Sequence, residues 1–232
     1  MARIPTLVAL LSLLTARVST QPGLPIDPTK LAPGRDSFAI RIQGVELGYT
    51  VSSTERTPEG IRLIERSSIG GLVEEQTTID LDPQGGMKAV RQEGKVQGEP
   101  TSIELTYADG RVRGVARTVG PEGPKSATVD TLAEAGVIDD NAVPGLLKAL
   151  PWAPGAHWSF AVFSGAQNEV RATELTVAAT DSLARPGGAL PVYRVEWTGG
   201  WQPTTFWITT TAPHRVMRIA IANAPVVIVR VN

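Results

Sequence analysis

The two histidines are the first candidates for chemistry, because imidazole can act as a general base and as a metal ligand near neutral pH. His157 lies between Ala156 and Trp158, where a strand is expected to begin, and His214 follows Pro213 in an expected turn. Neither has a second histidine or a carboxylate at helical spacing, so the spacing does not predict a zinc site. We interpret both as polar residues at strand ends.

The usual catalytic motifs are missing from the sequence. Ser164-Gly165 lacks the preceding glycine of a G-x-S-x-G elbow, and neither G-x-x-x-x-G-K-S/T nor G-x-G-x-x-G occurs. Glu74 and Glu75 are neighbours on an expected strand, so their side chains point to opposite faces. We predict no catalytic residues, no metal site and no cofactor. A hydrolase whose acids meet only in the folded chain is the remaining enzymatic alternative.

Aromatic residues are concentrated in the C-terminal half, where all five tryptophans fall between residues 152 and 207. Such a concentration indicates an aromatic-lined cavity for an apolar ligand inside a curved sheet. An ordinary hydrophobic core is the alternative interpretation. The residues predicted to line the cavity are Trp158, Phe160, Tyr193, Trp197, Phe206 and Trp207.

Length, charge and cysteine content limit the class of protein to which this chain can belong. A chain of 232 residues with 42% hydrophobic residues is long enough for one domain with a sizeable core. The formal net charge of -1 argues against binding to nucleic acid. The chain has no cysteine, which excludes disulfides and thiolate chemistry.

Residues 1–20 have the order of a secretory signal peptide, with Arg3, an apolar run from Ile4 to Ala16 and then a polar stretch. The run is shorter than the about 20 residues that span a bilayer, so we expect no transmembrane anchor after cleavage. Residues 21–35, with four prolines, are expected to form a linker or an extended lead-in to the domain. The absence of cysteines and of Asn-x-Ser/Thr sequences favours a bacterial periplasmic or secreted location.

The body of the chain, residues 36–232, is predicted to be a single antiparallel β domain. Apolar and polar residues alternate over short segments, and turn signals such as Gly70-Gly71 and Asp109-Gly110 recur about every ten residues. We count about twelve to fourteen strands. The expected fold is all-β, with one or two short helices and a strongly curved sheet or half-barrel.

A helical insert is predicted near residues 131–150, midway along the chain. Thr131 and Glu134 have the spacing of a capping box. Asp139-Asp140 can cap a second helix over about 141–150, which Pro151 ends. We expect this helix to lie against the concave side of the sheet, as a cover or as a plug.

Turn glycines and apolar strand residues recur in four segments, which are Gly44–Tyr49, Leu146–Pro151, Tyr193–Glu196 and Phe206–Ile208. Together these segments resemble an uncharacterised family of exported bacterial β-rich proteins, a domain of unknown function. The resemblance covers about 36–232 and implies no catalytic residue. The architecture is more loosely similar to the periplasmic half-barrels that carry lipoproteins and hold acyl chains.

Three functions follow as expectations. The first is non-catalytic binding of an apolar ligand, such as a lipid or a lipoprotein acyl chain. The second is a structural or protein-interaction module of the envelope, with a filled core and either an exposed edge strand or an apolar patch near Trp201. The third is the hydrolase described above.

Overall fold

Fifteen strands form one continuous sheet in this computed structural model, which describes residues 23–231. The strands of the first half are β1 (Gly34–Ile42), β2 (Val45–Thr57), β3 (Gly60–Ile69), β4 (Val73–Leu81), β5 (Met87–Val96), β6 (Glu99–Ala108), β7 (Arg111–Gly120) and β8 (Gly123–Leu132). Those of the second half are β9 (Ile138–Asp139), β10 (His157–Ser164), β11 (Glu169–Arg185), β12 (Gly188–Thr198), β13 (Thr204–Thr209), β14 (Val216–Ile221) and β15 (Val226–Arg230).

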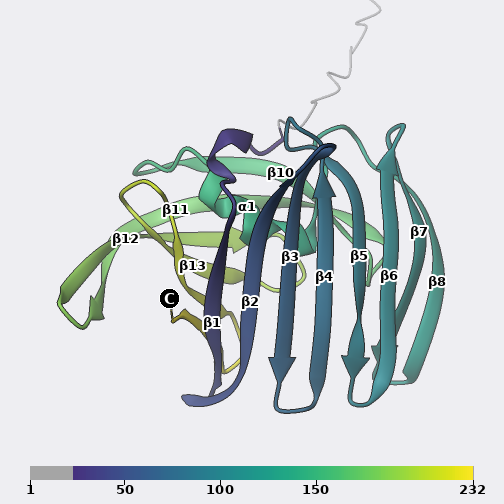
Figure 1. Cartoon of the computed structure of the whole chain (residues 1–232), viewed down its shortest axis with the longest axis horizontal. Coiled ribbons are helices and arrows are strands. Elements are labelled where there is room, and N and C mark those ends of the chain that lie inside the picture. Colours follow the sequence, from purple (N-terminus) through teal and green to yellow (C-terminus); the bar gives the residue numbers. More distant parts are fainter. Residues whose placement is uncertain (1–22, 232) are drawn as a thin grey trace, which may run out of the picture.

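The sheet consists of two antiparallel meanders joined by the first and last strands. Strands β1 to β8 pair in chain order, and so do β10 to β15. Strand β1 pairs with β15, with Phe38 opposite Arg230, while the two-residue β9 pairs in parallel with β10. Because β8 and β9 are the ends of this order, the sheet is not closed into a barrel (Figure 1). The prediction of a strongly curved, mainly antiparallel sheet is confirmed, with slightly more strands than expected.

Two glycines on the concave face allow neighbouring strands to approach closely. A Cβ atom on Gly94 of β5 would collide with the backbone carbonyl of Glu74, and one on Gly114 of β7 would collide with that of Glu104. Glycine inside a strand usually marks such a close approach or a bend. The curvature of the first half therefore depends in part on these two glycines, which have no Cβ atom to hold the strands apart.

A short helical segment fills the space inside the curve. It comprises η2 (Asp140–Ala142), α1 (Val143–Leu146) and η3 (Leu147–Ala149), and Figure 1 shows α1 between the strands of the two halves. The Asp139 side chain caps it by accepting a hydrogen bond from the Asn141 backbone N–H at 3.0 Å. The helix predicted over about 141–150 is confirmed. The helix expected to start at Thr131 is wrong, because pairing with β7 extends β8 to Leu132.

One hydrophobic core joins the helical segment to the concave face of both meanders. Alternation along each strand places every second side chain toward this core. Leu146, Leu147 and Leu150 have no exposed surface, and neither does Phe160. The helical segment thus acts as a plug that replaces solvent within the curved sheet.

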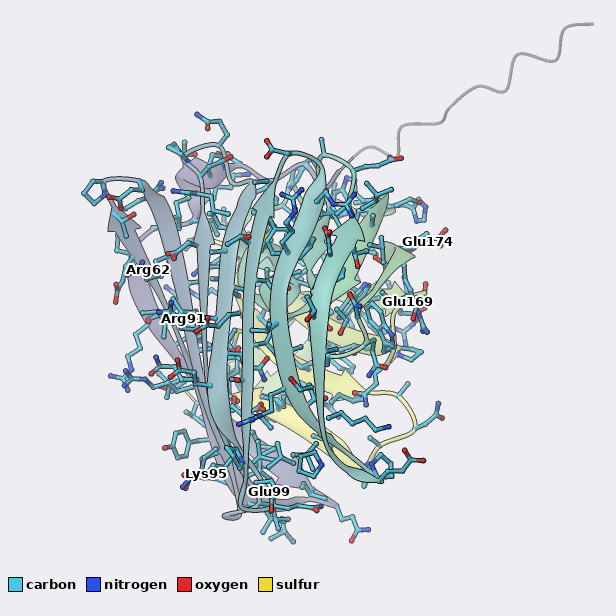
Figure 2. All side chains as sticks on the ribbon, turned by 90° about the vertical axis from the view of Figure 1, so that its right-hand side faces the viewer. Arg62, Arg91, Lys95, Glu99, Glu169 and Glu174 are labelled. Atoms are coloured by element: carbon cyan, nitrogen blue, oxygen red, sulfur yellow. The ribbon has the colours of Figure 1, made fainter. Side chains whose placement is uncertain are left out.

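Charged side chains cover the convex face of the first meander (Figure 2). They form cross-strand pairs, such as Arg62 with Asp80 at 2.7 Å and Arg91 with Glu104 at 3.6 Å. Pairs as exposed as these contribute little to stability. They make this face a solvated surface.

The proline-rich lead-in is packed against the domain and is not a free linker. Leu31 is fully buried, and the Asp27 backbone N–H donates to the Ala149 carbonyl at 3.0 Å. Apolar side chains between the prolines explain this packing, because they fix the extended chain on the end of the core. The predicted signal peptide, residues 1–20, lies outside the described residues.

Candidate ligand pocket at the mouth of the sheet

Five of the six predicted aromatic residues belong to the interior of the protein. Phe160 and Phe206 are fully buried, and Tyr193 is nearly so. Trp158 and Trp197 are partly buried and pack against the same core, with the Trp197 and Phe206 rings 6.4 Å apart. These side chains come together, but they fill the space that the prediction assigned to a ligand.

Trp207 lies on the other face of the sheet from these five residues. It follows the inward-facing Phe206 on β13, and side chains alternate between faces along a strand. The Arg218 guanidinium stacks over its ring at 4.7 Å. Trp207 therefore cannot share a lining with Phe206.

The two histidines make local contacts with polar groups. His157 Nδ1 lies 2.9 Å from the Thr176 hydroxyl, and His214 Nδ1 lies 2.8 Å from the Thr209 carbonyl oxygen. These contacts agree with our interpretation of both as polar residues at strand ends.

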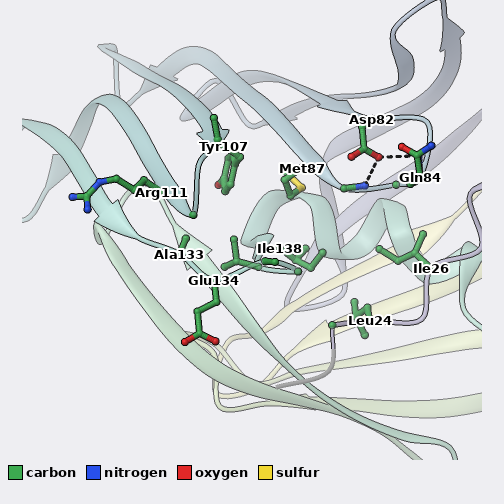
Figure 3. A pocket seen from close by; sticks show the side chains of 18 of the residues that line it. Leu24, Ile26, Asp82, Gln84, Met87, Tyr107, Arg111, Ala133, Glu134 and Ile138 are labelled. Carbon is green, nitrogen blue, oxygen red and sulfur yellow. Dashed lines mark hydrogen bonds between the residues drawn. The ribbon is translucent and has the colours of Figure 1, made fainter. Parts of the chain in front are cut away.

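An open pocket of about 450 Å³ lies where three turns and the lead-in segment meet at one end of the curved sheet. We call it the mouth pocket. Its apolar lining includes Leu24, Ile26, Met87, Tyr107 and Ile138. Figure 3 shows Met87, Tyr107 and Ile138 facing the same space, whereas Arg111 and Glu134 extend away from it. The arrangement is an apolar floor with a polar rim.

Local sequence fixes the turns that build this rim. Between β4 and β5, the Asp82 carboxylate accepts hydrogen bonds from the backbone N–H groups of Gln84 and Gly86, both at 2.8 Å. Between β6 and β7, Asp109 and Gly110 both have positive φ, as a type I′ hairpin turn requires. Both turns are hydrogen-bonded or geometrically restricted, so the pocket is largely preformed.

A buried acid supports the pocket floor from behind. The Tyr107 hydroxyl donates to the Asp139 carboxylate at 2.5 Å, and Asp139 is fully buried. Burial raises the pKa of the Asp139 carboxyl, and the neighbouring Asp140 raises it further. This contact holds the ring of Tyr107, a residue of the pocket lining, against the core.

The mouth pocket has the size of a small-molecule site. Its volume falls in the roughly 300–1,000 Å³ range of small-molecule sites, which are mostly apolar with a few polar groups. Within residues 23–231, no cluster of three or more potential metal ligands occurs. In the same range, no helix is long and apolar enough to cross a membrane.

The sequence analysis missed the mouth pocket because its residues come from turns and from the lead-in segment. Leu24 and Ile26 were expected in a linker, although two apolar residues between prolines were a signal of packing. Met87 and Ile138 belong to strands that are far apart in the chain. Alternation of residue types within one segment does not predict contacts between distant segments, so it could not predict this pocket.

A family model described as a protein of unknown function, DUF3108, matches residues 34–226. The chain belongs to this family. The match runs from the start of β1 to the first residue of β15 and confirms the expected membership in an uncharacterised β-rich family. It includes most of the mouth pocket but not the lead-in segment, residues 23–33.

A solved structure with a similar fold is described as a beta-barrel-like protein of domain of unknown function DUF1849 from Brucella abortus. The two sequences are 13% identical, the alignment covers 85% of this chain and 94% of that chain, and the TM-score is 0.47. No curated protein matches this chain. The description of the family names no activity.

Proposed function

We propose that this protein is an exported, non-catalytic binding protein of the bacterial periplasm or exterior. Its ligand is an amphipathic molecule with an apolar body, such as a lipid or a lipoprotein acyl chain, and its binding site is the mouth pocket. Residues 1–20, with the pattern of a signal peptide, support export. The polar rim and apolar floor of the pocket support the choice of ligand.

The single observation that carries this proposal is the contrast between the filled core and the open pocket. Five of the six predicted aromatic residues fill the interior with their own rings, which leaves little room for a ligand on the concave face. The mouth pocket instead leaves Met87, Tyr107 and Ile138 beside about 450 Å³ of open volume. Covering this apolar surface with a ligand would contribute roughly 25 cal/mol per Å² removed from water.

Native mass spectrometry of protein purified from a bacterial periplasm without detergent tests this function. We expect a discrete additional mass that solvent extraction recovers as lipid. Met87→Trp should abolish it by filling the pocket, whereas Val115→Trp, at an exposed position on β7, should retain it. A wild-type protein without additional mass, or a Met87→Trp variant that still carries lipid, would contradict the proposal.

A patch of exposed apolar residues favours a second function, that of an envelope module that binds another protein. Val45, Leu47 and Tyr49 alternate along β2 and are 59%, 45% and 55% exposed. Leu72 is 59% exposed in the turn whose Gly70 N–H donates to the Leu47 carbonyl at 2.7 Å. Contiguous apolar surface of this kind marks interaction sites.

A pull-down from envelope extract would test this second function. The wild-type chain should retain a specific protein that a Leu47→Lys/Tyr49→Lys double variant loses. The mouth-pocket variant Met87→Trp should retain that protein, which separates the two functions. Equal capture by wild type and the double variant would exclude the patch as the binding surface.

A further inference from the structure

Two arginines lie on the outer face of the second meander, one on either side of Trp207. Arg194 of β12 is directly opposite Trp207 of β13, and Trp207 is directly opposite Arg218 of β14. Residues directly opposite each other in antiparallel strands share a face, and the adjacent Phe206 belongs to the core. The three side chains therefore form one row across the strands, on the face that points away from the core. We call it the arginine–tryptophan row.

The residues around this row offer neither arginine a counterion. Ala179 of β11 is opposite Arg194, and Val229 of β15 is opposite Arg218. Glu196 follows two positions after Arg194 on β12, but it is exposed and forms no ion pair with Arg194. Among the described residues, neither guanidinium forms an ion pair or a hydrogen bond, and both Nε atoms are enclosed without a partner.

This lack of a partner distinguishes Arg194 and Arg218, which are both partly buried, from the other arginines. Four more arginines of residues 23–231 are buried or partly buried, and each pairs with a carboxylate; they are Arg62, Arg111, Arg171 and Arg230. The remaining arginines in this range are exposed. Because partial burial removes some of the hydration of a charge, it favours a counterion. For Arg194 and Arg218, that counterion is missing from the described chain.

Trp207 holds one of the two guanidiniums in place. The guanidinium carbon of Arg218 lies 4.7 Å from the centre of the Trp207 ring, within the about 6 Å of a cation–π contact. The Arg218 side chain thus reaches across one strand spacing toward the strand that carries Arg194. Two spacings of about 4.8 Å separate the backbones of the two arginines. Both guanidiniums can therefore reach a single ligand beside the ring.

The arrangement suits an anion with more than two free oxygens. A guanidinium donates two parallel N–H bonds to a pair of oxygens. A carboxylate has only two oxygens, so one arginine would occupy both. A phosphate monoester has three free oxygens in a tetrahedral arrangement, so two arginines can bind it from different sides. Only the Nε atoms of Arg194 and Arg218 are enclosed, which leaves their terminal Nη groups for such a ligand.

We propose that Arg194 and Arg218 bind a phosphate monoester between them, beside the ring of Trp207. The anion supplies the counterion that both guanidiniums lack. Glycerol 3-phosphate and the headgroup of phosphatidic acid share this chemistry, one as a soluble molecule and the other as a lipid. The row shares no residue with the mouth pocket, so the proposal does not depend on the function proposed for that pocket.

Isothermal titration calorimetry of the full chain with glycerol 3-phosphate tests the proposal, with glycerate as the carboxylate control. We expect saturable binding of glycerol 3-phosphate and none of glycerate. Arg194→Gln and Arg218→Gln should each weaken binding at least about tenfold, because each removes hydrogen bonds between charged groups. Arg185→Gln removes the same charge at an exposed position of β11 and should bind like wild type.

Co-flotation with phosphatidylcholine vesicles distinguishes the two sources of the phosphate. Vesicles that contain phosphatidic acid present a monoester, whereas vesicles with the same content of phosphatidylglycerol present a diester with two free oxygens. Binding of glycerol 3-phosphate without binding to either vesicle supports a soluble ligand. Binding to the phosphatidic acid vesicles alone supports a lipid headgroup. Equal binding to both vesicles, unchanged in Arg194→Gln and Arg218→Gln, would contradict the proposed site.

Arg194→Gln also separates binding from folding, because the charge that it removes has no partner in the described chain. Its melting temperature without ligand should equal or exceed that of wild type. The increase in melting temperature that glycerol 3-phosphate causes in wild type should be smaller in this variant. Arg194→Lys keeps the charge but loses the paired donors, so it should weaken binding as well. The proposal is overturned if neither glycerol 3-phosphate nor phosphatidic acid vesicles bind, if glycerate binds equally, or if both glutamine variants bind like wild type.

Discussion

At the scale of single residues, the most informative group is the buried carboxyl of Asp139. It accepts hydrogen bonds from the Tyr107 hydroxyl and from both the backbone and the side chain of Asn141. Burial, followed by the charge of Asp140, still raises its pKa above the ordinary value of 3.8. Hydrogen bonding thus offsets only part of the cost of holding a charge in the core.

This shift predicts the direction of a pH dependence. A group with a raised folded-state pKa contributes stability below its unfolded-state pKa and loses that contribution as the pH rises through the folded-state value. The free energy of unfolding should therefore be lower at about pH 8 than at about pH 5. Urea unfolding at both pH values measures this difference. The decrease in unfolding free energy from about pH 5 to about pH 8 should be smaller for Asp139→Asn than for wild type.

Asp130→Asn is the matched control for this pH experiment. Asp130 pairs with Arg111 at 2.6 Å, and this contact lowers the pKa of the Asp130 carboxyl. Its contribution is lost only as the pH falls through that lowered value, so the difference between about pH 5 and about pH 8 should match wild type. An Asp139→Asn variant with the full wild-type difference would show that other groups set the pH dependence.

At the scale of elements, alternation along β13 gives adjacent aromatic residues different roles. Phe206→Ala should lower the free energy of unfolding by about 3–5 kcal/mol, because a buried ring leaves a cavity. Trp207→Ala should cost about 0.5–2 kcal/mol, since it mainly loses the stacked Arg218. Chemical denaturation measures the unfolding free energies of both variants. Equal losses would contradict the placement of the two rings on opposite faces of β13.

The helical plug predicts a similar contrast between two leucines. Leu146→Ala should cost about 2–5 kcal/mol, because Leu146 has no exposed surface inside the curve. Leu132→Ala, at a position that is 72% exposed on β8, should change stability by no more than about 0.5 kcal/mol. Urea titrations provide the comparison. If Leu146→Ala lost no more unfolding free energy than Leu132→Ala, the helical segment would not stabilise the sheet.

The sequence predicted local structure better than it predicted the binding site. Alternation and turn signals such as Asp109-Gly110 predicted the hairpins, because a hairpin depends on neighbouring residues. The start of a helix at Thr131 was mispredicted, since sheet pairing outweighed the capping-box spacing. The aromatic residues were correctly assigned to a curved sheet, but whether rings fill or line an interior depends on how distant elements pack.

At the scale of the whole molecule, one seam joins the two meanders. Arg230 of β15 pairs with Asp36 of β1 and lies 6.0 Å over the Phe38 ring. Arg230→Ala should lower the free energy of unfolding by about 1.5–3 kcal/mol, the usual contribution of a hydrogen bond to a charged group. Arg41→Ala, whose pair with Glu46 is exposed, is the control and should have little effect. Similar costs for the two variants would show that the seam contributes no more than a surface pair.

The pairing of β1 with β15 also determines when the two edges of β1 can find their partners during synthesis. As the chain is synthesised, β1 can pair with β2 almost at once, but its other edge has no partner until β15 has been made. An unpaired edge strand is a template for association with other chains. Every nascent copy therefore exposes one edge of β1 to other chains while β2 to β14 are being made, and β15 is the strand that covers this edge.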